Sequence, residues 1–150
     1  MTIEEEREIH YILKEYLENV QVQSMRNYIQ HGSVSTYRHC WNVVNISYEL
    51  NKFLHLHANK EELLIGALLH DFYLYDWHEN DPSHRLHGYH HALTSKNNAV
   101  RYFDINENIQ NIIYCHMWPL NITRIPQCKE AWIVCMADKY SSIIETLFYR

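Results

Sequence analysis

The sequence predicts an all-α fold, a bundle of about six to seven helices, from three observations. Glycine and proline number only 3 each among 150 residues, whereas a β-sandwich or barrel needs many tight turns. Hydrophobic residues make up 47% of the chain, and they recur at helical spacing in several separate segments. The chain has no low-complexity tract, internal repeat or linker-like stretch, so we expect one domain over residues 1–150.

Two helices are expected at the N-terminal end, packing on the rest of the domain. Thr2 followed by Glu5 is a capping-box pattern, and apolar residues recur at helical spacing between residues 9 and 20. A second helical stretch is predicted over residues 22–30, with Gly32 just beyond its end.

The next two helices carry long apolar stripes. After a predicted linker at residues 33–35, a third helix is expected over residues 36–53. Asn59 is an N-cap residue for a fourth helix, and Glu61 and Glu62 stand in its first turn, where negative charge is favourable.

The C-terminal half is predicted to begin with a polar loop, residues 76–88, which would form a rim or lid. Helices are then expected over residues 89–103, 107–115 and 128–148. Asn106 caps the second of these, which stops before the prolines that follow it.

Charge and cysteine usage exclude several classes of protein. Lys and Arg number 13 against 18 Asp and Glu, a net charge of −5, and no basic cluster occurs, which disfavours nucleic-acid polymers and anionic membranes as partners. The acidic start MTIEEEREIH is unlike a signal peptide, and the apolar runs are too short to span a bilayer, so we expect a cytoplasmic protein. The four cysteines contain no CxxC pair and are predicted to be reduced and mostly buried.

Histidine is unusually frequent, 12 of 150 residues, and two histidines fall on inward helix faces. His39 begins an apolar row that continues through Val43 and Ile46. His116 follows Ile112 on the apolar face of its helix. Both side chains are therefore expected to point into the core.

Carboxylates occur in the same kind of place. His70 and Asp71 end an apolar helical run, and Asp138 follows seven consecutive apolar residues. An unpaired buried carboxylate costs several kcal/mol, so these acids need a cation. Nitrogen and carboxylate ligands without thiolate suit a divalent transition metal such as Mn, Fe, Zn, Co or Ni, and suit Mg less well.

The order of these groups, H, HD, H, D, resembles that of the HD superfamily of metal-dependent phosphohydrolases over residues 36–145. The resemblance implies a helical bundle with the site at its centre. It also implies that one metal ion is held by His39, His70, Asp71 and Asp138.

Dinuclear members of the superfamily contribute two more histidines, and their doublet aspartate bridges the ions. By this resemblance Asp71 would hold both ions, and His116 would be the second of the additional ligands. His91 is favoured for the first, with His87 or His90 as alternatives. One or two ions per chain are therefore expected.

The resemblance further implies that a metal-activated water cleaves a phosphoester of a nucleotide or another small phosphorylated metabolite, with Asp71 at the catalytic centre. Lys139 and Arg38, which adjoin Asp138 and His39 in the sequence, are expected to bind phosphate oxygens. Further candidates for such contacts are His84, Arg85 and His87. Two alternative functions stay open, an HD-type diiron oxygenase and a non-catalytic nucleotide-binding regulatory module. The oligomeric state also stays open, with a homodimer as one alternative.

Overall fold

Helices make up most of the structure, a computed structural model that describes residues 1–78 and 86–148. The α-helices are α1 (Ile3–Glu18), α2 (Val20–Ser24), α3 (Thr36–Phe53), α4 (Lys60–Leu69), α5 (His87–Tyr102), α6 (Glu107–Cys115) and α7 (Lys129–Phe148). A 3-10 turn, η1 (Met25–Asn27), precedes strands β1 (Ile29–His31) and β2 (Val34–Ser35). The strands pair as one antiparallel hairpin. The all-α prediction is confirmed.

Side-chain caps explain where several helices begin. At α1 the Thr2 hydroxyl accepts from the Glu5 backbone N–H at 3.2 Å, and the Glu5 carboxylate accepts from the Thr2 N–H at 2.7 Å. The side chains of Asn59 and Asn106 cap α4 and α6 by accepting from the backbone N–H of Glu62 and Ile109. The predicted bounds of α3 and α6 are confirmed, whereas α5 begins two residues earlier than predicted.

The prediction of a helix over residues 22–30 is wrong beyond Ser24. Helix α2 ends at Ser24, and the chain turns through Gly32 and Ser33 between the two strands. Gly32 has a φ of 56°, which glycine adopts without strain, and Gly-Ser is a turn pair for such hairpins. Tertiary contacts of the strands with the start of α3 outweigh the helical propensity of this segment.

Most of the loop predicted over residues 76–88 lies outside the described residues, and its last two residues belong to α5. Its role as a lid or rim therefore stays a prediction.

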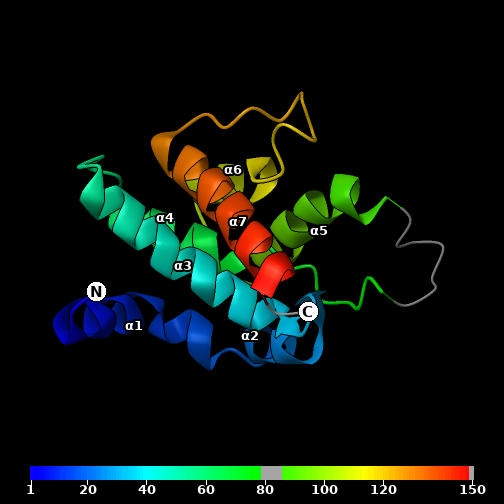
Figure 1. The fold of residues 1–150 in the computed structure, drawn as a ribbon, viewed down its shortest axis with the longest axis horizontal. Coiled ribbons are helices and arrows are strands. Elements are labelled where there is room, and N and C mark those ends of the chain that lie inside the picture. The colour runs from blue at the N-terminus through cyan, green and yellow to red at the C-terminus, as the bar shows by residue number, and fades with distance from the viewer. Residues whose placement is uncertain (79–85, 149–150) are drawn as a thin grey trace.

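The helices surround α4 (Figure 1). Helix α3 packs against α4 and α7, and α6 packs against α4, α5 and α7, while α1 lies along the outer side of α3 and α4. Residues 63–69 of α4 are all buried, which explains why this helix is apolar on every side. Gly66 allows close contact with α6, since a Cβ there would lie 2.5 Å from Ile112 Cγ2. Helix α4 thus brings its C-terminal end to the middle of the bundle.

Two helices end at histidines in this central region. His70 is the C-cap of α4, and His116 is the C-cap of α6. No helix among the described residues is both long and apolar enough to cross a membrane.

Candidate metal centre

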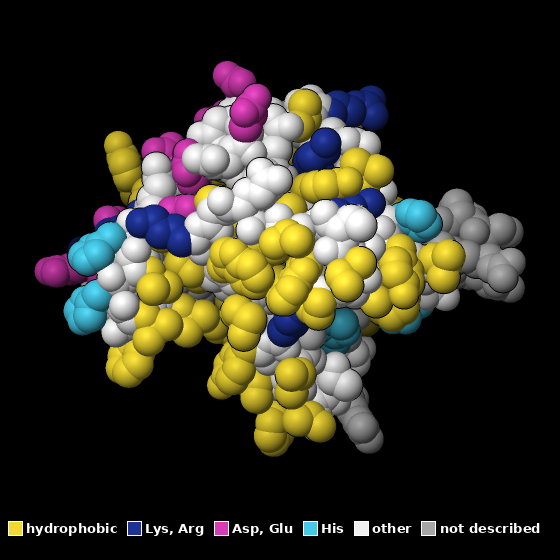
Figure 2. All heavy atoms as spheres, turned by 90° about the horizontal axis from the view of Figure 1, so that it is seen from above, with side chains coloured by type: hydrophobic (Ala, Val, Ile, Leu, Met, Phe, Trp, Pro, Cys, Tyr) yellow, Lys and Arg dark blue, Asp and Glu magenta, His cyan; other side chains and the backbone are white. Residues whose placement is uncertain are grey.

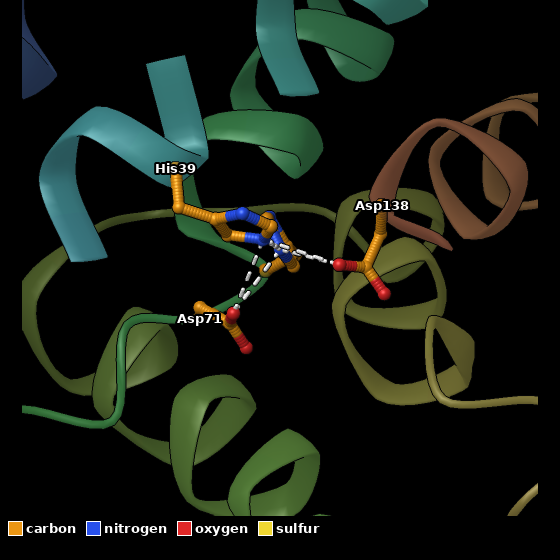
Figure 3. Close-up of side chains that lie close together, drawn as sticks. His39, Asp71 and Asp138 are labelled. Carbon is orange, nitrogen blue, oxygen red and sulfur yellow. Dashed lines mark hydrogen bonds and ion pairs between the residues drawn. The ribbon is translucent and has the colours of Figure 1, made fainter. Parts of the chain in front are cut away.

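Six predicted ligand side chains converge between the helices, and all are buried. They are His39 of α3, His70 and Asp71 at the end of α4, His91 of α5, His116 at the end of α6, and Asp138 of α7. Figure 3 shows three of them, His39, Asp71 and Asp138, pointing toward one another from separate parts of the fold.

The first group is His39, His70, Asp71 and Asp138, each of which offers a ligand atom within 4.8 Å of the others. His39 Nε2 lies 3.1 Å from Asp138 Oδ1, and His70 Nε2 lies 3.3 Å from Asp71 Oδ2. The two Nε2 atoms are 3.3 Å apart. Two nitrogens and two carboxylates are thus close enough to bind one ion together.

The second group consists of Asp71, His91 and His116. Asp71 Oδ1 lies 3.1 Å from His91 Nε2 and 3.4 Å from His116 Nε2, while its other oxygen faces the first group. Of the alternatives to His91, His90 is exposed, and His87 stacks on the outer side of the His91 ring at 4.4 Å. Asp71 therefore occupies a bridging position between two groups.

The outer nitrogens of the four histidines show which atoms face the centre. Each Nδ1 lies within 3 Å of an oxygen that can only accept: His39 of Glu145 Oε2, His70 of the Ala67 carbonyl, His91 of the His87 carbonyl, and His116 of the Ile113 carbonyl. Each Nδ1 therefore donates, and in the neutral ring the lone pair stays on Nε2. Ligand histidines of metal sites are commonly oriented in this way.

The inward atoms fit a cation better than they fit one another. His91 Nε2 and His116 Nε2 are 2.9 Å apart, and two lone pairs cannot form a hydrogen bond. Asp71 Oδ1 is buried and has no hydrogen-bond partner among the described residues. The donor set is compatible with a divalent metal, which would satisfy these atoms together.

In the metal-free protein, protonated histidines supply part of the positive charge that balances the buried carboxylates. Burial alone would lower the pKa of His39, but hydrogen bonds with Asp138 and Glu145 outweigh burial and raise it to about 10. The pKa of His70 is raised well above its usual value, since Asp71 outweighs burial there. Burial would raise the pKa of Asp71 and Asp138, yet the neighbouring histidines hold both well below the usual range.

We expect the metal-free protein to lose stability as the pH rises from about 6.5 through about 10. A histidine whose pKa is raised by folding stabilises the fold below its unfolded pKa, and this contribution is lost above its folded pKa. Urea unfolding of the chelated protein at a series of pH values measures the loss. The loss should be smaller in His39→Gln, and equal slopes in both proteins would contradict the assignment.

Glu145 is a functional candidate that the sequence reasoning missed. Its side chain is buried, with Oε2 2.8 Å from His39 Nδ1 and Oε1 accepting from Asn42 and Ser141 at 2.8 Å each. Its position seven residues after Asp138 places it two turns along the same helix face, a signal that could have been used. Glu145 holds the His39 ring with its Nε2 toward the centre.

Replacement Glu145→Gln should therefore lower metal affinity by about tenfold to a hundredfold, as for other carboxylates behind a ligand histidine. The isosteric amide lacks the charge that favours the His39 N–H. Competition titration with a chromophoric chelator measures the affinity, with the exposed Glu15→Gln as control. Unchanged affinity in Glu145→Gln would show that this carboxylate is only structural.

The hairpin supplies two more residues that the helix prediction concealed. Gln30 Nε2 donates to Asp71 Oδ2 at 2.6 Å, while its Oε1 accepts from the Tyr73 hydroxyl. The half-buried ring of His31 lies edge-on to His39, with ring centres 5.5 Å apart. The strands thus place Gln30 and His31 beside the centre.

A cavity of about 1020 Å³ opens onto both ligand groups. Lys139 lies in its wall, with Nζ 2.9 Å from the His116 carbonyl oxygen. Arg38 is exposed and lies in a different surface hollow, beside Trp41, so the structure does not bring it to the cavity. His87 is in the wall, whereas His84 and Arg85 lie outside the described residues.

The comparison with known families agrees with this centre. The HD domain family matches residues 36–143, which is more than half of the chain and includes every residue of both ligand groups. No curated protein and no solved structure matches the chain. The matched range begins with α3 and extends into α7, the helices that contribute His39 and Asp138. The chain therefore belongs to the HD family.

Proposed function

We propose that the protein hydrolyses a phosphoester of a nucleotide or another small phosphorylated metabolite, using one or two divalent transition-metal ions. The observation that carries the proposal is the bridging position of Asp71, between two ligand groups at the base of a cavity large enough for a small molecule. Paired metal sites of this kind are used for in-line displacement at phosphorus. Membership of a superfamily of metal-dependent hydrolases supports the same reaction class.

The chain's own residues provide binding and orientation. Hydrogen bonds at each Nδ1 hold the four histidine rings in place, and Gln30 holds one oxygen of Asp71. The chemistry that bound divalent ions supply is Lewis-acid catalysis, which acidifies water and neutralises charge developing on phosphoryl oxygens. Lys139, in the cavity wall, would add positive charge for a phosphoryl group bound there. Arg38 does not reach the cavity, so we do not expect it to bind phosphate oxygens.

The proposal is tested by counting metal and measuring phosphate release on the same samples. The chain is loaded in turn with Mn, Fe, Co, Ni and Zn and assayed with aryl phosphates, sugar phosphates and nucleotides. We expect two ions per chain and a phosphate release that a chelator abolishes. A folded, fully loaded protein that releases no phosphate from any ester would contradict the proposal, and oxygen consumption by the iron form would assign an oxygenase instead.

A matched pair of variants locates the second ion. His116→Gln removes a ligand of the second group and should leave about one ion per chain, because the first group remains complete. His90→Gln changes an exposed histidine of α5 and should keep both ions. Equal metal content in the two variants, measured by elemental analysis, would exclude His116 as a ligand.

A further inference from the structure

The outer wall of the cavity is mostly apolar. Its apolar side chains come from the segment after α4, the chain between α6 and α7, and α7 itself: Trp77, Leu86, Met117, Pro119, Leu120 and Ile143. Leu120 and Ile143 are also 45% and 60% exposed, so the apolar wall continues out to the surface. Figure 2, a view from above, shows hydrophobic side chains gathered over much of one face of the molecule, with the acidic side chains seen in that view mainly at its edge.

The apolar wall extends outward from a ligand histidine. The ring of His87 stacks on His91 with centres 4.4 Å apart and an angle of 14°. Trp77 in turn stacks on His87, with ring centres 5.1 Å apart and an angle of 11°. At the start of α5, Leu120 and Met117 lie against Gly88, where a Cβ would be 3.2 Å from Leu120 Cδ2. A group attached to a phosphoryl at the centre would lie between these surfaces.

Several polar side chains of the described wall already have partners. Ser142 Oγ donates to Asp138, and both polar ends of the Gln30 side chain are hydrogen-bonded. His87 Nδ1 lies 2.9 Å from the Tyr75 hydroxyl. A nucleobase and a ribose need several free donors and acceptors for recognition. Within the described wall, the imidazole of His31 and the buried indole N–H of Trp77 are left for this purpose, and two such groups are too few.

Positive charge in the wall is also limited. Lys139 is the one Lys or Arg among the described wall residues, and its Nζ lies within 3.4 Å of the His116 carbonyl and of both the carbonyl and the sulfur of Cys135. Nucleoside polyphosphates are usually held by several cations or by glycine-rich loops. The described wall offers no such set for a second or third phosphate.

We propose that the substrate carries a single phosphate on a large apolar group, alkyl or aromatic, which lies between the Trp77–His87 stack and Leu120. This inference rests on the proposed function and narrows its substrate class. It disfavours nucleoside polyphosphates, because they would place polar groups against the apolar wall and leave phosphates without cations.

Binding of n-alkyl phosphonates tests the inference without any turnover, because their carbon–phosphorus bond replaces the ester. Calorimetry on the metal-loaded protein should show affinity rising by about fourfold per methylene from methyl- to octylphosphonate, until the wall is covered. Octylphosphonate should bind more tightly than adenosine monophosphate or ATP, and with a negative heat-capacity change. Affinity that is independent of chain length, or tighter binding of ATP, would overturn the inference.

Two variants of one loop provide a matched comparison. Leu120→Ser places a hydroxyl in the apolar wall and should weaken the binding of octylphosphonate by about tenfold. The affinity should therefore rise less steeply with chain length. Ile122→Ser changes a side chain of the same loop that is 74% exposed and outside the wall, and should leave the dependence intact. Equal effects of the two changes would contradict the assigned position of the apolar group.

Parallel hydrolysis assays separate this inference from the proposed function. If alkyl phosphonates bind as expected and no phosphoester releases phosphate, the proposed function fails while the apolar preference of the site stands. If phosphate is released fastest from nucleotides and slowly from octyl phosphate, the proposed function stands and the substrate class is wrong.

Discussion

Replacement of Asp71 by asparagine is expected to remove both metal ions and to lower phosphoester hydrolysis by at least about a thousandfold. Asp71 is shared by the two ligand groups, and each of its oxygens faces histidine nitrogens of one group. Asparagine has the same shape but supplies one neutral oxygen and an NH₂ group. The lost charge is the one that attracts both cations, so both sites should weaken together.

Elemental analysis and phosphate release on the same preparation measure this effect. Asp104→Asn changes an exposed aspartate outside the cavity and serves as the control. Asp138→Asn gives a useful comparison, because Asp138 belongs to one group and should affect one ion more than the other. Retention of two ions and full activity by Asp71→Asn would refute the bridging assignment.

Gly66→Val is expected to destabilise the fold by about 3 kcal/mol, the upper part of the range for overpacking a core. A Cβ at Gly66 would lie 2.5 Å from Ile112 Cγ2 and 2.9 Å from both Cβ and Cδ1 of the same side chain. Ile112 is fully buried, so it has no free space into which to move. The lower helix propensity of glycine offsets less than this cost, since it is worth about 1 kcal/mol at most.

A double-mutant cycle with Ile112→Ala distinguishes the clash from other causes. Ile112→Ala alone should cost about 2–5 kcal/mol through the cavity it leaves. In that background Gly66→Val should cost much less than 3 kcal/mol, because the new methyl groups enter the vacated space. Denaturant unfolding of the four proteins gives the coupling, and additive effects would show that α4 and α6 do not touch at this point.

The parts of the fold that the sequence predicts well are specified locally. Helices α3 and α6 each combine a capping side chain with an apolar stripe, and α4 combines a capping side chain with a continuous apolar run, so the signals are local in each case. The inward direction of His39, Asp71, His116 and Asp138 follows from the apolar residues that precede or flank them in the sequence, so these positions could be placed without the structure.

The parts that could not be predicted depend on packing between distant segments. His87, His90 and His91 stand within about one turn of α5, and only its contacts decide which ring is buried in the centre. The hairpin is held beside Asp71 by a hydrogen bond from Gln30, across 41 positions of sequence. Glu145 reaches His39 across 106 positions, and no local pattern pairs them.

The ends of α4 and α6 have a consequence for the order of binding. Both helices finish at the centre, at His70 and His116, and each helix C-terminus carries about half an elementary negative charge. Together with Asp71 and Asp138 these ends place negative charge at the centre, and in the metal-free protein the protons on His39 and His70 offset part of it. Bound cations would add the positive charge that a phosphate needs at this place, so we expect metal loading to precede recognition of any phosphorylated ligand.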